Sequence, residues 1–246
     1  MTADLRAYTT ELTGHGGDPI EVYAAVPEAD GPHGSVVVIH HMPGFDEQTK
    51  EIVRKFAAFG YAAAMPNLYS REAPGASADD AAAAARALGG VPDPRLVGDV
   101  DAVASFLRSR PGSNGKVGVI GYCSGGRQSV LAACSLELDA AVDCYGAFVV
   151  VNPPAEHTLK VTALTEILPN LSCPMLGLFG AEDQYPSPEQ TAQLAGALAA
   201  HDKSFEHHTF EGAGHAFFAV ERPSYRPDAA VAGWTLIWDF FGRHLA

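Results

Sequence analysis

The segment Lys116-Val-Gly-Val-Ile-Gly-Tyr-Cys-Ser-Gly-Gly126 places Cys123 between an apolar stretch and a stretch of helical character. A nucleophile on a sharp turn between a strand and a helix needs small residues two positions to either side, because the two elements approach closely there. Gly121 and Gly125 meet that requirement. A helix that begins just after Cys123 would point its positive end at the sulfur and favour the reactive thiolate. The segment therefore predicts a nucleophilic cysteine.

Two other interpretations of this segment stay open. The first is a buried structural cysteine in a glycine-rich turn, which is what we expect for Cys134, Cys144 and Cys173. The second is a phosphate loop, because Gly121 to Gly126 has the spacing G-x-x-x-x-G. The chain continues with Arg127-Gln128 where that motif needs a lysine and a hydroxyl residue, so nucleotide binding is the weaker interpretation.

A cysteine nucleophile needs a base, and two later loops offer partners in the order nucleophile, acid, histidine. Asp183 follows an apolar stretch and could orient an imidazole, with Glu182 as the alternative acid. His215 lies in a glycine-containing loop beyond the last expected strand. An ordinary exposed acidic loop and a histidine with a purely structural role would also fit these positions. We predict that Cys123, Asp183 and His215 are the catalytic residues.

Attack on a carbonyl group also needs two N–H groups that stabilise the oxyanion. The backbone N–H groups of Ser124, directly after the nucleophile, and of Met42, after an earlier apolar stretch, are the candidates. Met42 follows His40 and His41. Adjacent residues on an extended strand point to opposite sides, and no H-E-x-x-H motif or carboxylate set accompanies this pair, so we expect no metal site.

Strands and helices that could position these residues alternate along the chain. Short apolar stretches predict strands at 35–41, 61–67, 116–123, 140–145, 174–180 and 204–211, and an edge hairpin from 9–13 and 21–26. Helical patterns cover 46–59, 95–107, the stretch after Cys123, the stretch from Ser187 and the C-terminus, and alanine-rich 76–87 predicts a surface helix. This alternation predicts an α/β protein with a mainly parallel central sheet, helices on both faces, and a site at the carboxyl ends of the strands.

Composition limits the partners. The 246 residues are 47% hydrophobic and 18% charged without a break in composition, so we expect a single domain over 1–246. A net charge of -13 and scattered basic residues argue against nucleic acid. The start of the chain does not resemble a signal peptide, no stretch is long enough to span a membrane, and the cysteines lack disulfide spacing, so we expect a cytoplasmic protein. The sequence does not predict the oligomeric state.

With these residues in place, the chain resembles the dienelactone hydrolase (carboxymethylenebutenolidase) family, whose members have the α/β-hydrolase fold. Four segments carry the resemblance: the loop after Ile39, 67–74, 121–125 and 212–217. The resemblance implies the triad Cys123, Asp183 and His215, a small-molecule lactone or activated ester as substrate, a thioester intermediate and no cofactor. A thioesterase or acyltransferase using the same site, and a catalytically idle binding protein, are the alternatives.

The chain departs from this family at two positions. His41 stands where members that hydrolyse dienelactone carry a glutamate near the nucleophile, and Ala219 stands where they carry the second of two carboxylate-binding arginines. Arg71 matches the first arginine, so we predict that Arg71 binds an anionic group of the substrate, and Arg222 is the nearby candidate for the second. His41 would contact the substrate and favour the Cys123 thiolate, unless it turns away to a loop.

Overall fold

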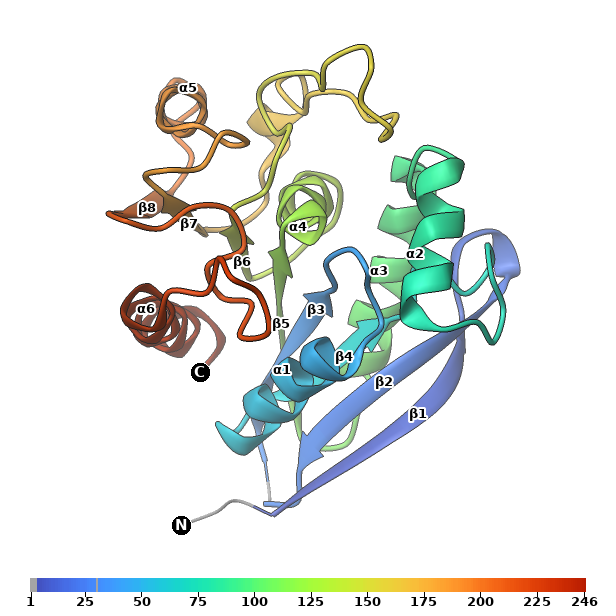
Figure 1. Ribbon diagram of the computed structural model, residues 1–246. Coiled ribbons are helices and arrows are strands. Elements are labelled where there is room, and N and C mark those ends of the chain that lie inside the picture. Colours follow the sequence, from blue (N-terminus) through green and yellow to red (C-terminus); the bar gives the residue numbers. More distant parts are fainter. Residues whose placement is uncertain (1–3, 30) are drawn as a thin grey trace.

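The computed structural model describes residues 4–29 and 31–246, and one eight-stranded sheet runs through it (Figure 1). The strand order is β1-β2-β4-β3-β5-β6-β7-β8. Strand β2 runs antiparallel to its neighbours β1 and β4, and the other neighbouring strands are parallel. The strands are β1 (Leu5–Thr13), β2 (Pro19–Pro27), β3 (His33–Ile39), β4 (Ala62–Pro66), β5 (Ser113–Tyr122), β6 (Ala140–Cys144), β7 (Met175–Gly180) and β8 (Phe205–Phe210). The predicted mainly parallel sheet and its antiparallel edge hairpin are confirmed.

Helices cover both faces of the sheet. They are α1 (Glu47–Ala58), α2 (Ala78–Ala87), α3 (Asp93–Arg108), α4 (Ser124–Ser135), α5 (Pro188–Ala199) and α6 (Pro227–Leu245), with short 3-10 turns at η1 (His15–Gly17) and η2 (Leu168–Asn170). Helices α1 and α6 pack on one face, and α3, α4 and α5 on the other (Figure 1). Two apolar cores result, one on each side of the sheet. In the part of the chain that the structure describes, none of these helices has the length and apolar character needed to cross a membrane.

Local sequence explains where individual helices begin. The side chain of Asp46 caps α1 by accepting a hydrogen bond from the backbone N–H of Thr49. Ser187 and Gln190 form a reciprocal capping box at the start of α5, as their spacing predicts. Each cap satisfies N–H groups that have no partner within the first helical turn.

The order of the strands brings two loops together. After β3 the chain moves outward to β4 on one side, and then returns to form β5 on the other side of β3. Ile39 at the end of β3 is paired with Gly121 in β5, so the loops that follow these strands begin next to each other and diverge. Ligands of open α/β sheets bind at such a reversal of strand order. Met42 and Cys123 lie in these two loops.

The turn from β5 into α4 is too tight for any residue but glycine at two positions. A Cβ atom on Gly121 would lie 1.8 Å from the carbonyl oxygen of Gly125, and one on Gly125 would lie 2.5 Å from the carbonyl oxygen of Ile39. Both contacts are with backbone, which cannot rotate away. The small residues predicted on either side of Cys123 are therefore required by the packing of strand against helix.

Gly121→Ala should lower the free energy of unfolding by about 3 kcal/mol or more, because the new methyl group forces β5 and α4 apart. Gly196→Ala is the matched control. Gly196 lies inside α5, and a Cβ atom there meets nothing within 4 Å. The control should therefore gain about 0.5–1 kcal/mol. Urea unfolding of both variants measures the difference, and equal stabilities would contradict the proposed contact.

Candidate active site

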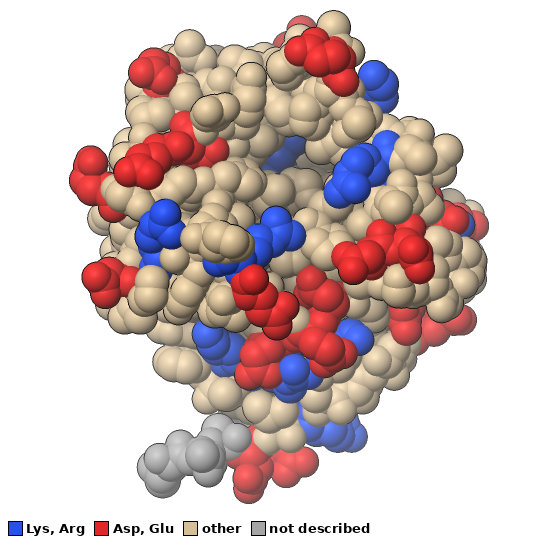
Figure 2. Space-filling model, in the orientation of Figure 1, with Lys and Arg blue, Asp and Glu red and all other residues tan. Residues whose placement is uncertain are grey.

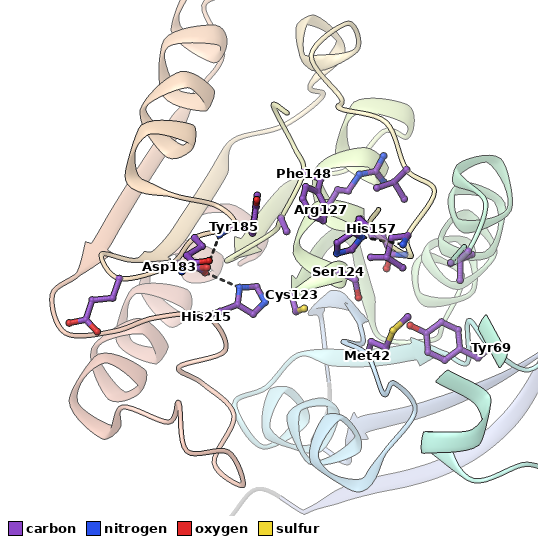
Figure 3. Close-up of a pocket in the computed structure, with 18 residues that line it drawn as sticks. Met42, Tyr69, Cys123, Ser124, Arg127, Phe148, His157, Asp183, Tyr185 and His215 are labelled. Carbon is purple, nitrogen blue, oxygen red and sulfur yellow. Dashed lines mark hydrogen bonds and ion pairs between the residues drawn. The ribbon is translucent and has the colours of Figure 1, made fainter. Parts of the chain in front are cut away.

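Cys123 lies at the tip of the turn between β5 and α4 in a strained backbone conformation. Its φ is 56° and its ψ is -119°, a combination that residues other than glycine rarely adopt. The Cys123 N–H donates to the carbonyl oxygen of Cys144 at 3.0 Å, which ties the turn to the end of β6. Figure 3 shows the sulfur on the side of the turn that faces His215. The tight turn, or elbow, between strand and helix that the sequence predicts at Cys123 has therefore formed.

The loops after β7 and β8 bring a carboxylate to the imidazole. The Nδ1 of His215 lies 2.8 Å from Oδ2 of Asp183. The other carboxylate oxygen of Asp183 accepts from the Tyr185 N–H at 2.9 Å, so two partners fix its orientation. Asp183 is buried, whereas the side chain of Glu182 is exposed. Of the two acids considered, Asp183 is the one that contacts the imidazole.

A second close approach holds these two loops together. A Cβ atom on Gly180, the last residue of β7, would lie 2.4 Å from the carbonyl oxygen of Ala213. The Glu182 N–H also donates to the Ala213 oxygen at 2.9 Å. The loop that carries His215 therefore lies directly against the loop that carries Asp183.

The surroundings of His215 favour its protonated form. Burial of the ring lowers its pKa, but the hydrogen bonds with Asp183 and with the Cys123 sulfur outweigh burial and raise the pKa of His215 to about 10. A proton on the imidazole is attracted by the carboxylate on one side and by the sulfur on the other. The imidazole is therefore held in its protonated form, with Asp183 on one side and the Cys123 sulfur on the other.

Met42 and Ser124 lie beside Cys123, on the side away from His215 (Figure 3). Neither backbone N–H has a hydrogen-bond acceptor among the described residues. Two unpaired N–H groups next to a nucleophile are what an oxyanion hole requires. Met42 and Ser124 therefore stay our prediction for that role.

His40 fixes the backbone just before Met42. Burial lowers the pKa of His40 to about 4, so the ring is neutral. Its Nε2 accepts from the Leu68 N–H at 3.1 Å, and its Nδ1–H donates to the carbonyl oxygen of His41 at 2.8 Å. Among the described residues, no three His, Cys, Asp or Glu side chains are grouped closely enough to hold a metal ion.

Arg71 lies elsewhere than its predicted role in substrate binding requires, because it is not among the residues that line the pocket around Cys123. Its guanidinium makes two parallel bonds to the buried Asp99, of 2.7 and 2.9 Å, and a third bond of 3.0 Å to Asp18. Arg71 thus links the turn between β1 and β2, which carries Asp18, to α3, which carries Asp99. Arg71 is therefore engaged with carboxylates of the protein itself, and we do not retain its predicted role in substrate binding.

His41 also makes a contact other than the one predicted from the sequence. Its Nε2 lies 2.8 Å from Oδ2 of Asp46, the residue that caps α1, and His41 is not among the lining residues of the pocket. Burial of Asp46 opposes its ionisation, but bonds with His41 and Thr49 hold the pKa of Asp46 at about 2. The side chain of His41 has therefore turned to the loop, and its predicted contact with substrate is not retained.

A pocket of about 470 Å³ opens over Cys123, and the sequence predicted little of its wall. Part of the wall comes from the irregular segment between β6 and η2, which has no periodic pattern. Tyr185, two residues after Asp183, closes another side. The remaining wall residues are Tyr69, Gly90, Val91, Arg127, Gln128, Ala147, Phe148, His157, Leu159, Val161, Glu182 and Gln184.

A buried carboxyl group lies beneath the elbow. Oδ1 of Asp143, in β6, accepts from the Gly146 N–H at 2.7 Å, and Oδ2 has no partner among the described residues. A Cβ atom on Gly126 would lie 2.4 Å from Oδ1, so Asp143 packs directly against the start of α4. Complete burial raises the pKa of Asp143 to about 7, even though the Gly146 bond and His215 act to lower it.

The fold, the elbow and the chain order of Cys123, Asp183 and His215 define the class of the α/β-hydrolases. A Pyrococcus horikoshii acylaminoacyl peptidase shares this fold, with a TM-score of 0.74 and 17% identity over 98% of this chain and 42% of that chain. The family model for the dienelactone hydrolase family matches residues 20–245. This chain belongs to the dienelactone hydrolase family and is a hydrolase that acts on ester bonds.

Two relatives illustrate the similarity. The Escherichia coli (strain K12) protein named "Putative carboxymethylenebutenolidase" is 33% identical over 234 residues, which are 93% of this chain and 84% of that protein. The crystal structure titled "Putative Dienelactone Hydrolase from Klebsiella pneumoniae" superposes with a TM-score of 0.85 and 30% identity, over 98% of this chain and 100% of that chain. Both likenesses extend over nearly the whole chain.

Asp183→Asn should reduce kcat for ester hydrolysis by about three to four powers of ten, because the amide no longer holds His215 in the productive orientation. Glu182→Gln is the matched control in the same loop and should leave kcat within about a factor of three. Steady-state kinetics on one activated ester measure both. A larger loss in Glu182→Gln than in Asp183→Asn would show that Glu182 is the catalytic acid.

Asp143→Asn should remove a pH dependence of stability. The folded protein holds the Asp143 proton up to about pH 7, whereas an unfolded chain releases it near the ordinary value of 3.8. The wild type should therefore lose up to about 4 kcal/mol relative to the variant as pH rises from about 4 to 7, and nothing further above that range. Parallel plots of stability against pH for the two proteins would contradict the assigned titration.

Proposed function

We propose that this protein is a cysteine-dependent hydrolase of a small lactone or activated ester, working through a thioester acyl-enzyme. One observation carries the proposal: the Nδ1 of His215 lies 2.8 Å from Asp183 while the ring faces the Cys123 sulfur at the elbow (Figure 3). The family supports the ester or lactone class, since relatives bear the name carboxymethylenebutenolidase.

In the first half of the reaction, the Cys123 thiolate attacks the carbonyl carbon of the substrate. The negative charge that develops on the carbonyl oxygen is stabilised by the N–H groups of Met42 and Ser124. The carbon–oxygen bond to the leaving group then breaks, and the His215 imidazolium gives its proton to the departing oxygen. A thioester on Cys123 and a neutral His215, still oriented by Asp183, remain.

In the second half, His215 acts as the base. It accepts a proton from a water molecule, and the resulting hydroxide attacks the thioester carbonyl. The carbon–sulfur bond breaks, the acid product leaves, and the thiolate and imidazolium pair is restored. When the substrate is a lactone, the leaving group stays attached to the acyl chain, so the product is one hydroxy acid or its keto form.

A reducing compartment such as the cytoplasm suits this chemistry. All four cysteines are free thiols, and the proposed mechanism requires Cys123 to stay reduced. Burial raises the pKa of Cys134 and of Cys173 to about 12 and raises that of Cys144 as well, so those three thiols are protected from reaction.

Mass spectrometry of the intact protein with a panel of lactones and activated esters tests the proposal. A single acyl adduct should form on Cys123, because the other three cysteines are buried. Cys123→Ala should abolish the adduct and all but a trace of turnover while leaving the thermal midpoint near that of the wild type. An adduct elsewhere, or ester hydrolysis that survives Cys123→Ala, would remove Cys123 as the nucleophile.

A further inference from the structure

The wall of the pocket beyond the triad consists mainly of uncharged side chains. Val91 and Phe148 are buried, and Leu159 and Val161 are half-buried. Figure 2 shows a hollow in the upper half of this face that is bordered mostly by residues other than Lys, Arg, Asp and Glu, with atoms of a Lys or Arg in its depth and others beside it. A substrate that reaches Cys123 must place part of its structure against this wall.

Arg127 lines the pocket, but its positive charge is already paired with a carboxylate of the protein. Its two terminal nitrogens each bond to a carboxylate oxygen of Asp93 at 2.9 Å, and one also donates to the carbonyl oxygen of Thr162 at 2.7 Å. The side chain is 3% exposed. Its Nε is buried and has no acceptor among the described residues. Arg127 therefore does not supply a free cation for a substrate.

Among the described residues that line the pocket, Arg127 is the only Lys or Arg, and Arg86, whose charge acts on Tyr69, is exposed and is not a lining residue. The other basic groups nearby are His157, Lys160 and Arg222. The Nδ1 of His157 accepts from the Leu159 N–H at 3.1 Å, so this nitrogen is already engaged with the protein backbone. Lys160 is not a lining residue, and its ammonium donates to the carbonyl oxygen of His157 at 3.3 Å. Arg222 donates to the carbonyl oxygen of Met42 at 3.3 Å, and Ala219 carries no charge.

The acidic groups of the pocket would repel an anion. Glu182 and Asp183 both line it, and the whole chain carries a net charge of -13. A carboxylate that leaves water for this wall would gain no cationic partner, and burial of an unpaired charge costs several kcal/mol. A neutral polar group can instead hydrogen-bond to Gln128 or to the Tyr69 hydroxyl, whose pKa burial raises.

We infer that the pocket selects substrates whose acyl group is uncharged and largely apolar, and discriminates against lactones and esters that carry a carboxylate. This inference rests on the proposed function and narrows its substrate class. The contacts of Arg71 support the inference, because Asp99 holds the Arg71 guanidinium away from the pocket.

The experiment compares two substrates that differ only in charge: the para-nitrophenyl monoester of adipic acid, with a free distal carboxylate, and the same ester with a distal carboxamide. The wild type should show a kcat/KM at least about tenfold higher for the amide. Equal values, or a preference for the carboxylate, would overturn the inference.

Leu159→Arg places a cation in the wall and should raise kcat/KM for the carboxylate ester at least about fivefold relative to the amide. Leu159→Gln, similar in length but neutral, is the control and should leave the ratio of the two substrates unchanged. An unchanged ratio in Leu159→Arg would show that the acyl group does not lie against this wall.

A second measurement separates this inference from the proposed function. If neither ester acylates Cys123, the proposed function fails. The charge preference can then still be measured through binding. The para-nitroanilide analogues of the two esters are added as ligands, and the extent to which each protects Cys123 from alkylation by iodoacetamide is compared. Stronger protection by the neutral anilide supports a pocket for uncharged groups, and equal or stronger protection by the anionic anilide refutes it.

Discussion

Strand β5 and helix α4 approach each other so closely that a methyl group on Gly121 would overlap the backbone of Gly125. The rest of the site depends on this contact. Because the chain must turn sharply between the two elements, Cys123 takes a positive φ and its sulfur projects from the end of the sheet. The same turn places the N-terminal end of α4 directly after Cys123. The strained backbone of Cys123 is thus a direct result of the packing of β5 against α4.

The partners of Cys123 arrive on loops that are themselves held by backbone contacts. Gly180 lets the loop that carries His215 lie against the loop that carries Asp183, and the two side chains then meet. The carboxylate on one side of the imidazole and the sulfur on the other stabilise a proton on the ring, which raises the pKa of His215. The charge distribution of the site therefore follows from the packing of three strand ends, and no single loop could create it.

Features that depend on local sequence could be predicted, and features that depend on distant partners could not. The strands, the helices, the glycines of the elbow and the chain order of the triad all leave a local signal. Arg71 follows a strand and matches a family segment, but nothing local reveals that Asp99, on a helix farther along the chain, holds it. The direction of His41 was ambiguous for the same reason, because its contact with Asp46 exists only in the folded loop. Several residues of the pocket wall could not be predicted, because they lie in the segment between β6 and η2, which has no periodic pattern of apolar residues.

One side of the pocket wall lies on a stretch of chain that carries none of the reacting groups. Cys123, Asp183 and His215 follow β5, β7 and β8, whereas Phe148, Leu159 and Val161 come from the irregular segment between β6 and η2. That segment supplies none of the predicted catalytic residues. Its length and composition can therefore change during evolution, or be exchanged by a designer, while the chemical step is preserved. Replacing this one connection would reshape one side of the pocket and leave the predicted catalytic residues in place.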